Sequence, residues 1–110
     1  MTSSKIAAIR SKIPRTEVLA IIAEEAAELA HAALKYRRTI DGTNPTPVSQ
    51  ADALSNLIEE LADVRTAVMV LFEMPQVAEI AIDQNVGLKV DRWMQRLEAM
   101  EAMDDESSHL

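Results

Sequence analysis

Two short acidic segments, 24–28 and 59–63, contain the side chains in this sequence that are best suited to chemistry. The first reads Glu-Glu-Ala-Ala-Glu and the second reads Glu-Glu-Leu-Ala-Asp. Each places carboxylates three positions apart, and residues at that spacing are neighbours on the surface of a helix. The pairs are Glu25 with Glu28 and Glu60 with Asp63. If two such helices pack side by side, the carboxylates repel one another unless a cation lies between them. The segments therefore predict a site for Mg²⁺, which prefers oxygen ligands.

The position of Glu25 on its helix supports a site rather than a solvated surface. At about 100° per residue, an apolar stripe runs along this helix. The members of the stripe are Val18, Ile21, Ile22, Leu29 and Ala33. Glu25 falls in the middle of the stripe and Glu28 falls at its edge, and a carboxylate on a core face is costly unless it is paired or binds a metal. A single Glu-x-x-Glu is usually only a solvated face, but the second copy and the apolar surroundings favour a metal site.

The second acidic segment lies on a different side of its helix from the main apolar stripe. That stripe consists of Leu54, Leu57, Ile58, Leu61, Val68 and Phe72. Glu60 and Asp63 share their own side with Ala67, Val70 and Leu71. Because both sides are apolar, we expect this helix to be buried on two faces. Glu60 and Asp63 then open into a second contact surface.

Composition predicts an all-α protein. The chain has 110 residues, of which 48% are hydrophobic but only 3% aromatic, with two glycines. This composition suits helix packing rather than sheets. Periodicity predicts helices over about 1–13, 16–38, 49–73 and 75–103, with Thr16 and Ser49 as N-caps and Pro75 as a first helical residue. We expect a four-helix bundle-like domain over 1–103, packed antiparallel and completed by oligomerisation, and a disordered acidic tail over 104–110.

The longest predicted loop covers residues 39–49, which include two prolines and a glycine. A loop of this length in a compact domain is often functional, so it could close over a substrate. It could equally be a simple crossover on the surface. The sequence does not choose between these alternatives.

Charge and cysteine content restrict the partners and the compartment. The formal net charge is −7, which argues against binding a nucleic-acid polymer, because that requires clustered Lys and Arg. There are no cysteines, as is usual in a reducing compartment. No stretch approaches the roughly 18 apolar residues of a membrane span. We expect a soluble cytoplasmic protein that does not contact membranes.

Polar and cationic residues outside the acidic segments have two possible roles each. Asn85, Lys89 and Arg92 share one side of the fourth predicted helix, where they are either solvent-exposed or bind phosphate oxygens. Lys35 and its basic neighbours near the end of the second predicted helix suit the helix dipole there, or could hold a phosphate. A lone helical histidine is usually a surface or packing residue, so His31 is left out of the predicted site.

The two acidic motifs, in this order, resemble those of the MazG-like all-α nucleoside triphosphate pyrophosphohydrolases. The matching positions are Glu24, Glu25 and Glu28, followed by Glu60 and Asp63. The resemblance covers about residues 16–95, and the 31 residues between the motifs form a longer connection than the minimal motif has. The resemblance implies cleavage of a nucleoside triphosphate between its α- and β-phosphates, with Mg²⁺ as the cofactor and Mn²⁺ as an alternative.

The same resemblance implies roles for the site residues. Glu25, Glu28, Glu60 and Asp63 would hold the metal. Glu24, Glu25 and Glu28 would act in catalysis, with Glu24 as a further ligand or a base that orients water. Asn85, Lys89 and Arg92 would bind the substrate, and the protein would form a homodimer or homotetramer. Two alternatives remain open: hydrolysis of phosphoribosyl-ATP, and a non-catalytic helical oligomer that binds a nucleotide or a protein.

Overall fold

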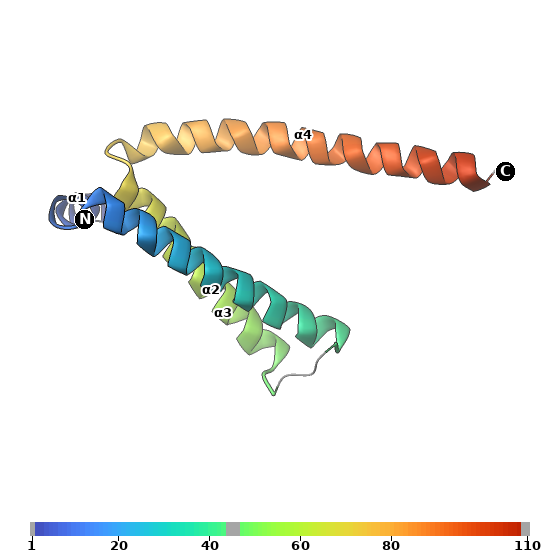
Figure 1. The fold of residues 1–110 in the computed structure, drawn as a ribbon, viewed down its shortest axis with the longest axis horizontal. Helices are drawn as coiled ribbons and strands as arrows, with labels where there is room; N and C mark the ends of the chain where they lie inside the picture. The colour runs from blue at the N-terminus through green and yellow to red at the C-terminus, as the bar shows by residue number, and fades with distance from the viewer. Residues whose placement is uncertain (1, 44–46, 109–110) are drawn as a thin grey trace. The chain divides into compact units, whose positions relative to one another are not determined.

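The computed structural model describes residues 2–43 and 47–108, and these residues form helices and connections without any strand. The helices are α1 Thr2–Lys12, α2 Arg15–Asp41, α3 Gln50–Leu71 and α4 Pro75–Ser108 (Figure 1). The predicted all-α class is confirmed. The chain divides into two units, Met1–Glu73 with the first three helices and Met74–Leu110 with α4.

Helices α2 and α3 lie side by side and form the body of the first unit (Figure 1). Val18 near the start of α2 packs with Val70 near the end of α3. Further along, Glu28 of α2 and Asn56 of α3 line one pocket, so the two helices run antiparallel. The buried side chains of the pair are Val18, Ala32, Ala53, Ala67 and Val70. Because most of these are alanines, the two backbones can approach closely.

Helix α1 packs against the end of this pair. Its one buried side chain, Ile6, joins Val18 and Val70 in the hydrophobic core. Arg10 Nε donates a hydrogen bond to the Val70 carbonyl at 2.8 Å, and its Nη2 donates to the Met69 carbonyl at 3.0 Å. The last carbonyls of a helix have no partner within the helix, and a cation there also suits the helix dipole. Arg10 therefore caps the C-terminal end of α3.

The observed helix starts agree with two of the three predicted starts. Ser49 is the N-cap of α3, and its hydroxyl oxygen accepts a hydrogen bond from the Asp52 backbone N–H at 3.1 Å. Pro75 is the first residue of α4, as predicted. Thr16 is not an N-cap, because α2 already begins at Arg15. The carbonyl of Pro14 accepts the first bonds of that helix, from the backbone N–H groups of residues 17 and 18.

Helix α2 ends three residues later than the sequence suggested, at Asp41 instead of Arg38. Gly42 stops it with a left-handed φ of 72°, and its N–H donates to the Arg38 carbonyl at 3.0 Å. Glycine adopts this conformation without the steric cost that a Cβ would add, which makes it a common helix terminator. The predicted loop over 39–49 is therefore shorter at its start. Its central residues, 44–46, lie outside the described residues.

The face of α3 that is most buried is not the one that the main apolar stripe predicted. The face with Ala53, Glu60, Ala67 and Val70, here called the inner face, lies against α2. The outer face, defined by Leu54, Ile58 and Leu61 of the predicted main stripe, is 39–57% exposed. The other members of that stripe, Leu57, Val68 and Phe72, are half-buried, so the second face of α3 is only partly covered within this chain. Its burial by another copy stays a prediction. On α2, Ala32 is buried and Ala33, which was assigned to the stripe, is exposed.

Helix α4 makes up the second unit, and every described side chain from 79 to 106 is exposed. This includes its predicted core stripe, Ile82, Val86, Val90, Trp93 and Leu97. The helix continues past 103 to Ser108, into the segment predicted to be a disordered tail, because extending a helix costs less than starting one. The expectation of one domain over 1–103 stays a prediction, since α4 buries no side chain in a core of its own.

Candidate metal centre

The antiparallel pairing of α2 and α3 brings the two acidic segments together. One carboxylate oxygen from each of Glu25, Glu60 and Asp63 lies within 4.8 Å of the other two. Glu25 and Glu60 are half-buried and Asp63 is exposed. Mg²⁺ binds oxygens at about 2.1 Å, so the ligands of one ion lie roughly 3–4 Å apart. The 4.8 Å limit on the oxygen separations is somewhat wider than that spacing.

Two oxygens of this cluster are buried without a partner. Glu25 Oε2 and Glu60 Oε2 accept no hydrogen bond from any of the described residues. A buried acceptor without a donor is destabilising, and buried carboxylates are normally paired or bound to a metal. A divalent cation bound among these carboxylates would supply the kind of partner that such oxygens lack. The donor set therefore fits a hard cation that prefers oxygen ligands.

Burial and repulsion raise the pKa values of both half-buried carboxyls. Burial is the largest cause for Glu25, and the negative charges of Glu28 and Asp63 raise its pKa further. Burial is also the largest cause for Glu60, again followed by the charges of Glu28 and Asp63. Carboxylates this close favour sharing a proton, which adds to the shift of each. A bound cation would act in the opposite direction and favour the ionised forms.

The other predicted acidic residues lie around this centre. Glu28 is exposed, but its charge is the largest electrostatic contribution to the raised pKa values of both Glu25 and Glu60. It therefore belongs to the cluster, although it is not among the three residues whose oxygens converge. Glu24 is also exposed and makes the smallest contribution to the shift of Glu25. Its position fits a peripheral role better than that of a direct ligand.

The three residues assigned to substrate binding lie in the second unit. Asn85, Lys89 and Arg92 are exposed on α4, and Asn85 Nδ2 donates to the Ala81 carbonyl at 2.8 Å. This bond to the preceding turn uses one of the two amide hydrogens of Asn85. The role of the three residues in binding phosphate stays a prediction.

A pocket lies on each side of the carboxylate cluster, between α2 and α3. The apolar pocket, toward α1, has a volume of about 250 Å³ and includes Glu25 and Asp63. Its other lining residues are Ile9, Ile13, Val18, Ile21, Thr66, Ala67 and Val70. The polar pocket, toward the end of α2, has a volume of about 200 Å³. It is lined by Glu28, His31, Ala32, Lys35, Asn56 and Glu60.

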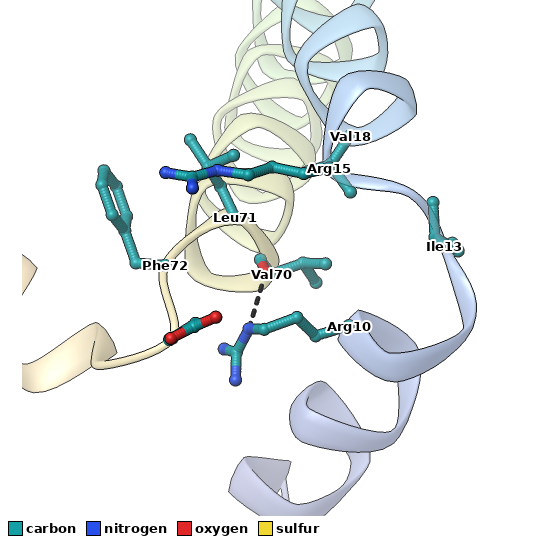
Figure 2. Close-up of a pocket in the computed structure, with 8 residues that line it drawn as sticks. Arg10, Ile13, Arg15, Val18, Val70, Leu71 and Phe72 are labelled. Atoms are coloured by element: carbon teal, nitrogen blue, oxygen red, sulfur yellow. Dashed lines mark hydrogen bonds between the residues drawn. The ribbon is translucent and has the colours of Figure 1, made fainter.

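A third pocket, of about 330 Å³, lies where α1, α2 and the end of α3 meet. Figure 2 shows Arg10 and Arg15 extending from α1 and α2 toward the last residues of α3. Arg10 is held by carbonyls of the last turn of α3, and the Glu73 carboxylate also lines the pocket. The bonds of Arg10 indicate a structural role, since they connect the helices of this unit.

Sequence reasoning excluded His31 and left the role of Lys35 open, and both line the polar pocket beside Glu28. The available signal was their spacing, because positions 28, 31 and 35 lie on one side of a helix. Asn56 was missed entirely. It lies four residues before Glu60, so it shares the side of α3 that bears the acidic motif.

Comparison with known proteins gives no relative: no family model, no curated protein and no solved structure matches the chain. Of the helices within residues 2–43 and 47–108, none has both the length and the apolar character required to cross a membrane.

Proposed function

We propose that this protein is a Mg²⁺-dependent nucleoside triphosphate pyrophosphohydrolase of the MazG-like type, which removes unwanted nucleotides in the cytoplasm. The reaction would cleave a ribo- or deoxyribonucleoside triphosphate to the monophosphate and pyrophosphate. The observation that supports this most strongly is the convergence of both acidic motifs on one centre with buried, unpartnered carboxylate oxygens. The order and spacing within the two motifs, from Glu24 to Asp63, support the same family.

In this proposal Glu25, Glu60 and Asp63 hold the metal, with Glu28 at the edge of the cluster. When bound, Mg²⁺ neutralises charge on the phosphates and makes a water molecule a better nucleophile. Mn²⁺, with the same preference for oxygen, would be an alternative ion. The half-burial of Glu25 and Glu60 strengthens their attraction for a cation, because charges interact more strongly where water is partly excluded.

The remaining predicted residues have supporting roles in the same proposal. Glu24 would orient water or act as an outer ligand, consistent with its exposed position beside Glu25. Asn85, Lys89 and Arg92 would contribute donors to phosphate oxygens. They are exposed on α4 and therefore accessible to a ligand.

We further propose that the chain forms a homodimer or homotetramer in which helices complete a bundle between copies. Exposed apolar surface supports this, since contiguous apolar patches on a soluble protein usually mark contact sites. The outer face of α3 exposes Leu54, Ile58 and Leu61. Along α4, the large apolar residues from Val77 to Met103 are 43–68% exposed.

The test is pyrophosphate release by the purified protein across a panel of substrates, with Mg²⁺ and with EDTA as the control. The panel contains the deoxyribonucleoside and ribonucleoside triphosphates and phosphoribosyl-ATP. Magnesium-dependent activity on dUTP or dCTP, with the monophosphate as the second product, is the expected result. Activity confined to phosphoribosyl-ATP would instead assign the alternative reaction. Absence of activity on every substrate would contradict the proposal and leave a non-catalytic oligomer.

A further inference from the structure

The two pockets beside the carboxylate cluster differ in chemistry. Apart from Glu25 and Asp63, the apolar pocket is lined by aliphatic side chains and Thr66. The Thr66 hydroxyl already donates to the Ala62 carbonyl at 2.7 Å. The polar pocket is instead lined by His31, Lys35 and Asn56, whose side chains carry hydrogen-bond donors, together with Ala32 and the acidic Glu28 and Glu60. A ligand that spans the cluster would therefore meet apolar surface at one end and hydrogen-bond donors at the other.

Lys35 is the strongest donor of the polar pocket. Its side chain is half-buried and forms no ion pair with any other described residue. Side chains on a helix lean toward its N-terminus, so Lys35 of α2 leans toward Glu28 and the cluster. An ammonium group is a compact cation that binds phosphate oxygens well. The half-buried amide of Asn56 adds donors from the facing helix.

A purely structural role for Lys35, as a counter-ion to the acidic cluster, is the competing explanation. The structure gives it little support. Lys35 forms no ion pair with Glu28, Glu60 or any other described residue, although Glu28 and Glu60 line the same pocket. A counter-ion would be expected to form such a pair, so the ammonium group of Lys35 is open to an anion that enters the pocket.

We propose that the polyphosphate arm of a nucleotide extends from the carboxylate cluster into the polar pocket, where it contacts Lys35, His31 and Asn56, and that the nucleoside occupies the apolar pocket. This orientation rests on the proposed function and specifies in which direction the nucleotide lies across the carboxylate cluster. Pyrophosphate would leave from the polar pocket, while the monophosphate would be held by the pocket that contains Ile21. The polyphosphate needs donors and the metal, whereas the base and sugar gain from apolar contact.

The experiment compares two variants that affect opposite ends of the ligand, Lys35→Ala and Ile21→Asn. Isothermal titration calorimetry measures the binding of imidodiphosphate, a non-hydrolysable pyrophosphate analogue, and of dUMP and dCMP, all with Mg²⁺ present. Because a charge-assisted hydrogen bond is lost, we expect Lys35→Ala to weaken the binding of imidodiphosphate by about 10- to 100-fold. Binding of the monophosphates should change little. Ile21→Asn is expected to show the opposite pattern, with monophosphate binding weakened by about tenfold.

Two matched controls separate a specific contact from a general charge effect. Lys35→Arg keeps the cation and is expected to recover most of the imidodiphosphate affinity. Arg37→Ala removes an exposed cation from the same helix, one that pairs with Asp41 at 3.2 Å, and is expected to leave both affinities unchanged. Circular dichroism and thermal melting verify that each variant keeps its helices, and titration with Mn²⁺ alone verifies that Lys35→Ala still binds metal.

The outcomes distinguish this orientation from the proposed function itself. If the wild-type protein hydrolyses nucleotides and Lys35→Ala binds imidodiphosphate as the wild type does, the orientation is wrong and the function stands. The orientation is also wrong, and the function also stands, if Lys35→Ala weakens only the binding of the monophosphates, because the ligand would then lie in the reverse direction. If the wild type neither releases pyrophosphate nor binds imidodiphosphate with Mg²⁺, the function and the orientation both fail.

Discussion

The inner and outer faces of α3 show how contact surfaces are chosen in this molecule. The outer face carries larger aliphatic side chains, yet Ile58 is 57% exposed. The inner face carries Glu60 and small alanines, yet it is the face that packs against α2 and buries Ala53 to 1% exposure. Within the first unit, close approach of small side chains therefore takes precedence over the amount of apolar surface on a face. As a result, Glu60 is half-buried, whereas Leu54 and Leu61 are left exposed.

The largest expected effect is on catalysis, through the carboxylates. Asp63→Asn or Glu28→Gln should lower pyrophosphate release by about 1,000-fold or more, which corresponds to about 4 kcal/mol of transition-state stabilisation. The reason is that each change removes charge from the proposed metal centre while keeping the shape of the side chain. Glu59→Gln, an exposed neighbour outside the cluster, is the control and should retain full activity.

Circular dichroism should show an unchanged helical content in both variants, because neither carboxylate holds the helices together. The assignment of the site would be wrong if Asp63→Asn kept the wild-type rate with Mg²⁺.

The next largest effect is on the stability of the inner face. Ala53→Leu should reduce the free energy of unfolding by about 1–3 kcal/mol, because a larger side chain must force α2 and α3 apart. Ala53 is 1% exposed, whereas Ala62 on the same helix is exposed. Urea denaturation of Ala53→Leu and of the control Ala62→Leu measures the difference. Equal stabilities of the two variants would show that this contact is not tightly packed.

A charge placed on the outer face of α3 should weaken the association between chains rather than destabilise the fold. Leu61→Glu places a carboxylate on the exposed stripe of α3, where Leu61 is 50% exposed. We expect the dissociation constant of the oligomer to rise at least about tenfold, with little change in helical content, because an unpaired charge at an interface is costly. Analytical ultracentrifugation measures the constant, with Glu59→Gln as the control. An unchanged constant would mean that this face does not take part in association.

The smallest effect is a pH dependence of stability caused by the carboxylates at the cluster. The pKa values of Glu25 and Glu60 in the folded protein lie above the ordinary value of 4.5. The metal-free protein therefore gains stability as pH falls from above these raised values toward 4.5, and loses it as pH rises. Melting temperatures in EDTA should follow this trend, and the double variant Glu25→Gln with Glu60→Gln should weaken it.

Addition of Mg²⁺ should reverse the sign of that dependence. The metal requires ionised carboxylates, so protons compete with it and the stabilisation by Mg²⁺ should decline as pH falls. A stabilisation by Mg²⁺ that did not depend on pH would place the ion away from Glu25 and Glu60.

The sequence predicted local features well because they depend on neighbouring residues. Ser49 as an N-cap and Pro75 as a first helical residue follow from chemistry within one turn. The convergence of Glu25, Glu60 and Asp63 also follows once two helices pair antiparallel in this register.

The incorrect predictions concern which helix faces pack against each other. The sequence of one helix alone does not determine its packing partner. Periodicity identifies the apolar sides of α3 but does not say that α2 takes the side with the alanines. Likewise, the role of His31 could not be assigned from α2 alone, because the polar pocket exists only when Asn56 of α3 faces it. The end of α2 was misplaced because Gly42, rather than the residues before it, decides where the helix stops.

The bonds from Arg10 to the last carbonyls of α3 connect residues that are up to 60 positions apart in the chain. Contacts between residues so far apart in the chain close a large loop at an entropic cost, so we expect α1 to dock after the α2–α3 pair has formed. Until it docks, the apolar pocket lacks Ile9 and Ile13, which both come from the N-terminal segment. Ile9 and Ile13 are therefore among the last residues of this unit to reach their final positions, and the apolar pocket is completed with them.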